Sequence, residues 1–209
     1  MRVLVACEFS GIVRDAFIAR GHDAVSCDLL PSERPGPHYR GDIRDMLARL
    51  SDAPFFRGID LMIAHPPCTY LANSGVRWLY GGKGTTLDED RYARMVDAAL
   101  FFGDLLEAPI PRIAIENPVM HGIGRQVIHD YSGGADMVQT IQPWMFGHGE
   151  TKATCLWLKN LPPLVPTDVV DGRTPRVHHA SPGPDRWKER SRTLQGIAEA
   201  MADQWGQVL

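Results

Sequence analysis

Apolar and polar positions along the chain predict a strand, a helix and a second strand at its start. Residues 2–7 (RVLVAC) form a continuous, β-rich apolar run, which predicts a buried strand. Apolar residues at helical spacing follow over residues 12–20, and Gly21 stands where a C-terminal cap belongs. Residues 23–28 then predict a second strand that ends in an acidic residue. A unit of this kind indicates neighbouring parallel strands.

The same alternation continues to the end of the chain. We expect further helices over residues 45–50, 88–107 and 196–205, and further strands over residues 59–64, 112–115, 136–142 and 154–158. Residues 80–86, rich in glycine, and residues 162–184, rich in proline, glycine and charge, are expected to be the least ordered. Together these elements predict an α/β fold with a doubly wound, mostly parallel sheet.

In sheets of this kind, ligands bind beyond the carboxyl ends of the strands. The residues that follow four of the predicted strands are Ser10 and Gly11, Asp28, Cys68, and Glu116. We therefore expect these positions to face one crevice. Gly11 would let the backbone approach a ligand, and Asp28 would accept hydrogen bonds from ribose hydroxyls. The full GxGxxG fingerprint is absent, so turn geometry alone is the alternative explanation for this glycine and aspartate.

Cys68 is the cysteine that the sequence marks for chemistry. Two prolines precede it directly and fix the direction of the backbone at the end of a strand. A thiolate is a strong nucleophile, so a positioned cysteine in a crevice is a candidate for covalent catalysis. The alternative is a small buried hydrophobe, which is how we interpret Cys7 and Cys27 in their apolar runs.

Glu116 stands at the inner end of a predicted buried strand, where a carboxylate is costly unless it is paired or functional. In a partly desolvated site we expect its pKa to rise. Glu116 would then act as an acid or hold a protonated ring nitrogen. A helix N-cap or a turn carboxylate is the structural alternative.

Composition limits the function classes. The 209 residues suit one compact domain with, at most, a small appendage, and no signal peptide or membrane-length apolar stretch is present, so a cytoplasmic location is expected. The four cysteines show no CxxC pairing, which argues against a metal site or a disulfide framework. A net charge of −3 counts mildly against non-specific DNA binding. The basic segment Arg173–Arg192 is either a solvated face or a phosphate-contacting segment.

The ordered motifs resemble those of the DNA cytosine-C5 methyltransferases. The matching segments are Phe9-Ser10-Gly11, Asp28, Gly41-Asp42-Ile43, Pro66-Pro67-Cys68, Ser74-Gly75, Glu116-Asn117-Pro118, and Lys152 with Thr154. They correspond, in the family's own order, to its first motif, its acidic residue, its Gly-Asp-Ile, Pro-Cys, Ser-x-x-Gly and Glu-Asn-Val motifs, and its Gln-x-Arg-x-Arg strand. The resemblance runs over residues 2–158 and implies a Rossmann-like, class I methyltransferase that uses S-adenosylmethionine.

The resemblance also implies roles for individual residues. The implied catalytic residues are Cys68, Glu116, Asn117 and Lys152. S-adenosylmethionine would be held by Phe9, Ser10, Gly11, Asp28, Asp42 and Pro66. The substrate would be contacted by Pro67, Ser74, Thr154, Arg190 and Arg192.

In the implied reaction, Cys68 adds to carbon 6 of cytosine and Glu116 hydrogen-bonds or protonates N3, so that carbon 5 can accept a methyl group. Asn117 would orient its loop, and Lys152 would contact the nucleotide's phosphate or the base carbonyl. The partner is DNA, either a single strand or a duplex whose cytosine is flipped out. No metal or membrane partner is expected.

The chain departs from the family where that family carries its target-recognition domain. We expect a catalytic domain over residues 1–158, a short basic segment over 159–189 in place of the recognition domain, and a C-terminal helix over 190–209 that packs back on the catalytic domain. So short a segment predicts low sequence specificity, since base-edge contacts are what specify sequence. A small variant of this kind resembles a phage or mobile-element enzyme, working in a bacterial or phage-infected cell. The glycines missing from the first motif leave a modified S-adenosylmethionine open.

Other functions fit the same residues. The same chemistry on a free cytidine nucleotide or on RNA would suit the acidic net charge. A non-catalytic module that binds nucleotides or mimics DNA would suit a degenerate site, although the presence of both Cys68 and Glu116 argues against it.

Overall fold

One sheet organises the chain in the computed structural model, which describes residues 1–49, 58–81, 85–176, 183 and 186–208. Within these residues the sheet has seven strands in the order β3-β2-β1-β4-β5-β7-β6. They are β1 Arg2–Ala6, β2 Asp23–Asp28, β3 His38–Arg40, β4 Leu61–Ala64, β5 Arg112–Pro118, β6 Met137–Ile141 and β7 Thr154–Lys159. β7 runs antiparallel to both of its neighbours, and the other pairs are parallel.

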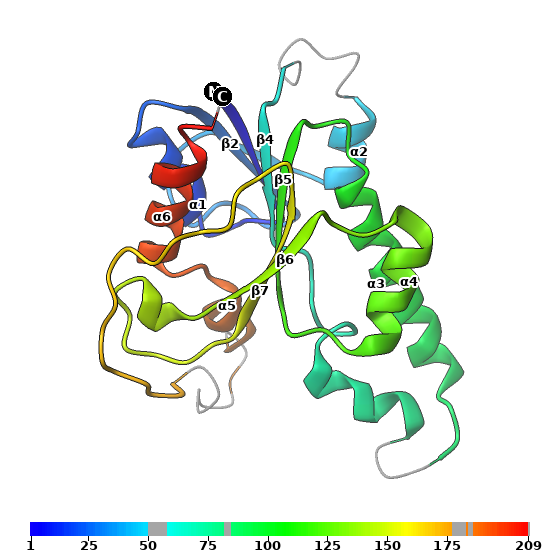
Figure 1. Ribbon diagram of the computed structural model, residues 1–209. Helices are drawn as coiled ribbons and strands as arrows, with labels where there is room; N and C mark the ends of the chain where they lie inside the picture. Colours follow the sequence, from blue (N-terminus) through cyan, green and yellow to red (C-terminus); the bar gives the residue numbers. More distant parts are fainter. Residues whose placement is uncertain (50–57, 82–84, 177–182, 184–185, 209) are drawn as a thin grey trace.

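Helices cover both faces of the sheet (Figure 1). One face carries α1 (Ile12–Ile18) and α6 (Gln195–Trp205), which pack on each other. The other face carries α2 (Ile43–Ala48), α3 (Glu89–Leu106) and α4 (Gly122–Ser132). The remaining helices of the described chain are the 3-10 helices η2 (Asn73–Tyr80) and η3 (Pro143–Met145) and the short helix α5 (Arg186–Ser191).

The alternation of side chains along each strand divides the core into two layers. In β1, Val3 and Val5 point to the α1–α6 face, whereas Leu4 and Ala6 point to the α3 face, and all four are fully buried. Strands that are buried on both sides have continuous apolar sequences, as β1 does.

The sequence predicted this architecture with differences of detail. The expected helix over 45–50 begins earlier, at Ile43, because Asp42 caps it by accepting a hydrogen bond from the backbone N of Arg44 at 2.8 Å. The expected strand over 112–115 continues to Pro118, because β7 pairs with it as far as Thr154. β3 and α4 were not expected at all.

Residues 162–176 are not the loose segment that their composition predicted. Backbone hydrogen bonds join Gly147 to Asp168 at 2.7 Å and Thr151 to Thr174 at 3.1 Å, so this stretch lies along residues 143–151. The Gln204 side chain of α6 binds the backbone N and O of Val165, each at 2.8 Å. Residues 177–182 and 184, like 82–84 in the glycine-rich stretch, lie outside the described residues.

The strand order identifies the fold. An otherwise parallel α/β sheet with antiparallel β7 inserted between β5 and β6 is the Rossmann-like fold of class I methyltransferases. None of the described helices has the length and apolar character needed to cross a membrane.

Candidate active site

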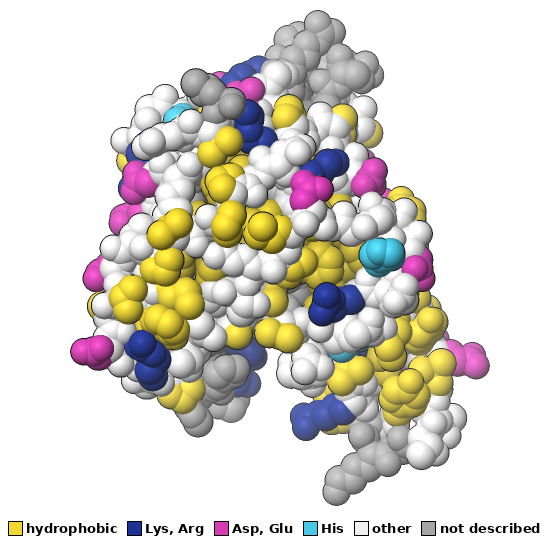
Figure 2. Space-filling model, viewed as in Figure 1, with side chains coloured by type: hydrophobic (Ala, Val, Ile, Leu, Met, Phe, Trp, Pro, Cys, Tyr) yellow, Lys and Arg dark blue, Asp and Glu magenta, His cyan; other side chains and the backbone are white. Residues whose placement is uncertain are grey.

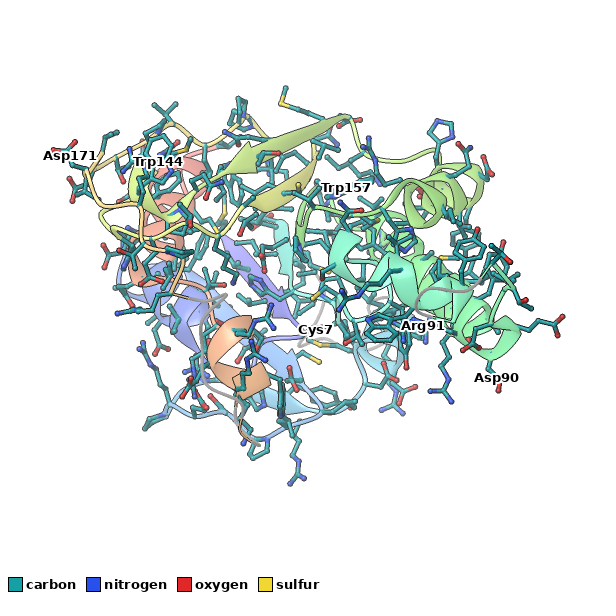
Figure 3. The ribbon with its side chains drawn as sticks, turned by 90° about the horizontal axis from the view of Figure 1, so that it is seen from below. Cys7, Asp90, Arg91, Trp144, Trp157 and Asp171 are labelled. Atoms are coloured by element: carbon teal, nitrogen blue, oxygen red, sulfur yellow. The ribbon has the colours of Figure 1, made fainter. Side chains whose placement is uncertain are left out.

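The carboxyl ends of the parallel strands open into a cleft. Figure 2 shows the lower edge of the molecule hollowed between two projections, on the side away from the chain termini (Figures 1 and 2). Seen from below, Cys7 at the end of β1 lies near the middle of this edge, with Arg91 on one side and Trp144 on the other (Figure 3). Cys7 has a left-handed backbone, φ 56°, which is uncommon outside glycine. The hollow therefore lies at the edge where the parallel strands end.

Cys68 lies in a tight turn after β4. Its carbonyl accepts hydrogen bonds from the backbone N of Leu71 at 3.1 Å and of Ala72 at 2.9 Å. Of the prolines that precede it, Pro66 is buried and Pro67 is exposed, and the Cys68 residue is half-buried. The turn thus holds the cysteine at the border between the core and the cleft.

The Cys68 turn is tied to the chain that follows β5. The backbone N of His121 donates to the Leu71 carbonyl at 3.1 Å, and the backbone N of Asn73 donates to the Val119 carbonyl at 2.8 Å. The buried His121 ring joins the two segments as well, because its Nε2 lies 3.0 Å from the Tyr70 carbonyl while its Nδ1 accepts from a backbone N of α4. The Cys68 turn and the chain that follows the Glu116 strand therefore form one unit.

Glu116 lies beside His65. The β4–β5 register pairs Ala64 with Ile115, so the next residues of the two strands are neighbours. His65 Nδ1 and Glu116 Oε2 are 3.2 Å apart, and their side chains are only 7% and 14% exposed. This position faces the α1–α6 layer, as Ala114 does.

The pKa of Glu116 moves opposite to the expectation from sequence. Burial by itself raises the pKa of this carboxyl, but the hydrogen bond with His65 and the positive charge of Lys152 outweigh burial, and the Thr154 hydroxyl acts in the same direction. The net pKa is lowered, so Glu116 is an ionised carboxylate in the free protein. The predicted rise was wrong because the sequence pattern showed the burial but not these partners.

Cys68 shares this electrostatic environment. Burial raises the pKa of the Cys68 thiol, and the negative charge of Glu116 raises it further, whereas Lys152 and Arg190 act to lower it. The net pKa is raised, so the free protein carries a thiol rather than a thiolate at neutral pH. The mutual influence of these four side chains shows that the chain brings them to one place.

Lys152 and Thr154 close the far side of Glu116. Lys152 Nζ donates to the Arg190 carbonyl at 2.9 Å, and Thr154 Oγ1 donates to the Lys152 carbonyl at 3.2 Å. Together with Glu116, with Thr193 and Leu194 just before α6 and with Ile197 of α6, they line a cavity of about 10 Å³. Such a volume holds about one water molecule and no larger ligand.

Asn117 makes no side-chain hydrogen bond within the described part of the chain. Its side chain is completely buried, and neither the amide nitrogen nor the amide oxygen has a partner within the described part of the chain. It follows Glu116 in β5 and therefore faces the α3 layer instead. Unpartnered buried amide atoms are rare and call for a partner that is absent from the free chain.

At the other end of the cleft, Glu8 occupies the N-terminus of α1. The buried Glu8 carboxylate accepts from the backbone N of Val13 at 2.7 Å and of Arg14 at 3.3 Å, and from Ser10 Oγ at 3.2 Å. The N–H groups that bind anions at helix N-termini are thus used within the chain. An anionic group of a ligand cannot take the same donors.

Gly11 is required for a reason that the sequence did not show. Its φ is 73°, and a Cβ at this position would lie 2.5 Å from Nη2 of Arg14. The Arg14 side chain is completely buried and donates to the carbonyls of Arg34 at 3.3 Å and Pro35 at 3.1 Å. Gly11 therefore makes room for the arginine that fixes the loop after β2.

The predicted donor-binding acids lie at neighbouring strand ends. Asp28 is half-buried at the end of β2, burial raises its pKa, and it accepts from the backbone N of Leu30 at 2.9 Å. Its carbonyl accepts from Gly41 N at 2.9 Å, directly before the exposed Asp42. Phe9 is buried under Trp187 of α5, with ring centroids 5.9 Å apart.

These residues suit the nucleoside part of S-adenosylmethionine. Asp28 and Asp42 place carboxylate acceptors at adjacent strand ends, which is the chemistry that ribose hydroxyls and an adenine amine require. His65 Nε2 adds a buried polar atom with no partner among the described residues, near enough to influence the pKa of Asp28. A ligand carboxylate would have to bind away from the N-terminus of α1, because Glu8 already uses the N–H groups there.

The predicted substrate-binding residues do not share one environment in the structure. Arg192 makes a bidentate ion pair with Glu33, at 2.6 and 2.9 Å, which ties the chain after α5 to the loop after β2. Arg190, Pro67 and Ser74 are exposed, the last of these in η2. Contact with DNA stays a prediction for these residues. In the described chain, no group of three or more His, Cys, Asp or Glu is placed to hold a metal ion.

Comparisons with known proteins do not assign the chain to a family. No family model and no curated protein matches the chain. One similar solved structure is an Escherichia coli chain described as a candidate DNA modification methyltransferase encoded within a prophage. It has a TM-score of 0.48 and 16% identity, over 83% of this chain and 53% of that one. The protein thus spans about half the length of the chain it matches, and a likeness at this level says nothing about its activity.

Sequence reasoning missed some of the residues that shape the site. His65 precedes the Pro-Pro-Cys motif directly, and its place after a buried strand was the signal that could have marked it. His121 and Tyr70 act on the Cys68 turn through contacts that only the fold creates. The Tyr70 ring lies under Arg91, 5.2 Å from ring centroid to guanidinium carbon, and Arg94 donates to its hydroxyl at 3.3 Å, beside a surface hollow of about 260 Å³.

Proposed function

We propose that the protein transfers a methyl group from S-adenosylmethionine to carbon 5 of cytosine in DNA, with Cys68 as the nucleophile. The observation that carries this proposal is the joining of the Cys68 turn to the loop after β5. That joining places a thiol, a buried carboxylate and Lys152 in one electrostatic environment at the end of a class I methyltransferase sheet. A nucleophile next to a group that can hold the ring nitrogen is what addition to a pyrimidine requires.

The chain's residues would act in sequence. Cys68 first loses its proton to water, which Lys152 and Arg190 favour by their charge. The sulfur then adds to carbon 6, and Glu116 stabilises the proton gained by N3. When bound, S-adenosylmethionine supplies the electrophilic methyl group that carbon 5 takes up. Water removes the carbon-5 proton, and the sulfur leaves as carbon 5 and carbon 6 regain their double bond.

The donor site would use the residues at the ends of β1, β2 and β3. Asp28 would accept from the ribose hydroxyls and Asp42 from the adenine amine, with Phe9 and Pro66 lining the walls. Ser10 and Gly11 shape this site indirectly, through the Glu8 carboxylate and the Arg14 guanidinium.

The DNA would enter the cleft with its cytosine flipped out of the stack, or as a single strand. Lys152 would contact the nucleotide's phosphate, while Pro67, Ser74, Thr154 and Arg190 would face the strand. Low sequence specificity follows from the short segment 159–189, because residues 167–174 within it lie along residues 144–151. Little chain is left to read base edges.

The test is a methylation assay with unmodified duplex DNA, followed by nucleoside mass spectrometry for 5-methylcytosine. We expect the product with the wild-type protein and with Cys155→Ala, a buried cysteine of β7, and none with Cys68→Ala. Product from Cys68→Ala would refute the covalent mechanism. Product only on RNA or free cytidine nucleotides would replace the substrate, and no product on any of them would favour a non-catalytic binding module.

A further inference from the structure

We propose that His65 is a positioning residue that acts through Glu116, holding the carboxylate toward the base and supplying the proton that Glu116 passes to N3 of the target cytosine. This inference rests on the proposed function. It assigns the source of the proton that N3 receives, because the Glu116 carboxylate has no proton of its own to give.

The geometry of the pair supports a shared proton. An ionised carboxylate only accepts hydrogen bonds, so at 3.2 Å the hydrogen between the two groups belongs to His65 Nδ1. Both side chains are largely buried, at 7% and 14% exposure, and they face the same layer of the sheet. The bond fixes the carboxylate through Oε2.

The electrostatic surroundings explain why Glu116 needs a proton from elsewhere. Its pKa is lowered by His65 and Lys152, so by itself it reaches the base without a proton. The charged or titratable groups that act around this pair are Asp28 at the end of β2, Cys68 after β4, Lys152 before β7 and, through Cys68, Arg190. Among these, His65 alone is bonded to the Glu116 carboxylate and able to give it a proton.

The proposed step conserves atoms and electrons. As the Cys68 sulfur bonds to carbon 6, the C5–C6 double-bond pair moves to C4–C5, and the C4–N3 double-bond pair becomes a lone pair on N3. That lone pair takes a proton from the Glu116 carboxyl, which has received it from Nδ1 of a doubly protonated His65. His65 is left as neutral imidazole with hydrogen on Nε2. When the sulfur leaves, the proton returns by the same route.

The test compares His65→Asn with the wild type in single-turnover methylation of duplex DNA across pH. An asparagine side chain keeps a hydrogen-bond donor for Glu116 but has no proton to give. We expect a loss of about 100-fold near neutral pH, typical of a missing acid. Because Glu116 can take a proton directly from acidic solvent, we also expect the ratio of wild-type to variant rates to be smaller in acid than near neutral pH. A ratio that stays constant with pH would overturn the inference.

Further variants separate this role from a structural one. If His65 acts through Glu116, His65→Asn adds no further loss in a Glu116→Gln background, whereas additive losses would refute the coupling. His129→Asn, an exposed histidine of α4, serves as the matched control and should behave as wild type. Titration with S-adenosylhomocysteine checks that each variant is folded. A wild type that methylates no cytosine would refute the proposed function and this inference with it, while an active wild type with an equally active His65→Asn refutes the inference alone.

Discussion

The contacts of Arg14 allow a quantitative prediction of how strongly the loop after β2 is held in place. Its side chain is completely buried, and its guanidinium donates to the carbonyls of Arg34 and Pro35 and to the hydroxyls of Ser26 and Ser32, at 3.1 to 3.3 Å. Replacing it by methionine keeps most of the apolar stem and removes all of these bonds.

The expected cost follows from these contacts. Each buried hydrogen bond contributes about 1 kcal/mol to stability, and somewhat more when the donor is charged. In the variant, the carbonyls of Arg34 and Pro35 regain part of this stability by binding water, because both residues are exposed. We therefore expect Arg14→Met to lower the free energy of unfolding by about 3 kcal/mol.

Urea unfolding followed by tryptophan fluorescence measures this change, with Arg14→Lys as the companion variant. Lysine keeps the charge but cannot bind several acceptors at once, so it should recover only part of the loss. Since the loop follows Asp28, Arg14→Met should also weaken S-adenosylhomocysteine binding by about tenfold, which corresponds to 1.4 kcal/mol. A loss of stability below about 1 kcal/mol would show that the loop is not held by Arg14.

Further predictions concern the Cys68 turn and the surface. Because the pKa of the Cys68 thiol is raised, its thiolate fraction should increase as pH rises toward that pKa, and Lys152→Met should move this increase to higher pH when it is followed by the rate of thiol alkylation. His121→Ala should cost about 2 kcal/mol of stability in urea and slow methylation, leaving S-adenosylhomocysteine binding unchanged, since it unties only the Cys68 turn. Glu33→Gln should change stability by less than about 1 kcal/mol, because its ion pair with Arg192 is one-third exposed. These estimates would be contradicted if Lys152→Met left the pH dependence of the Cys68 thiolate unchanged, or if His121→Ala kept the wild-type stability. A strongly destabilised Glu33→Gln would contradict the third.

The sequence predicted the parts of the fold that depend on local patterns. β1, β2 and β4 were found because strands buried on both faces are apolar throughout. α4 was missed because Gly122 and Gly124 weaken its helical pattern. It forms nevertheless, since Ile128 packs into the core and His121 caps its first turn. The continuation of β5 to Pro118 depends on β7, which no local pattern around Glu116 could show.

The candidate site was predicted as a set of positions but not as an electrostatic unit. Strand order was enough to bring Cys68 and Glu116 to one edge of the sheet. The direction of the Glu116 pKa depends instead on His65, which is 51 residues away in the sequence, and on Lys152 beyond the next strand. The unpartnered amide of Asn117 likewise depends on the layer that β5 presents to α3. Such pairings exist only once the sheet has formed.

The two ends of the chain meet at the edge of the sheet opposite the cleft (Figure 1). The N-terminal amine lies 3.4 Å from Nδ1 of His22, and Gly206 lies against the same imidazole ring. A short linker could therefore join residues 1 and 208, and a circular permutant opened at an exposed loop should keep the sheet intact. A fluorescent protein or an affinity handle fused at either end would project away from the cleft, so surface immobilisation for binding measurements would leave the cleft open.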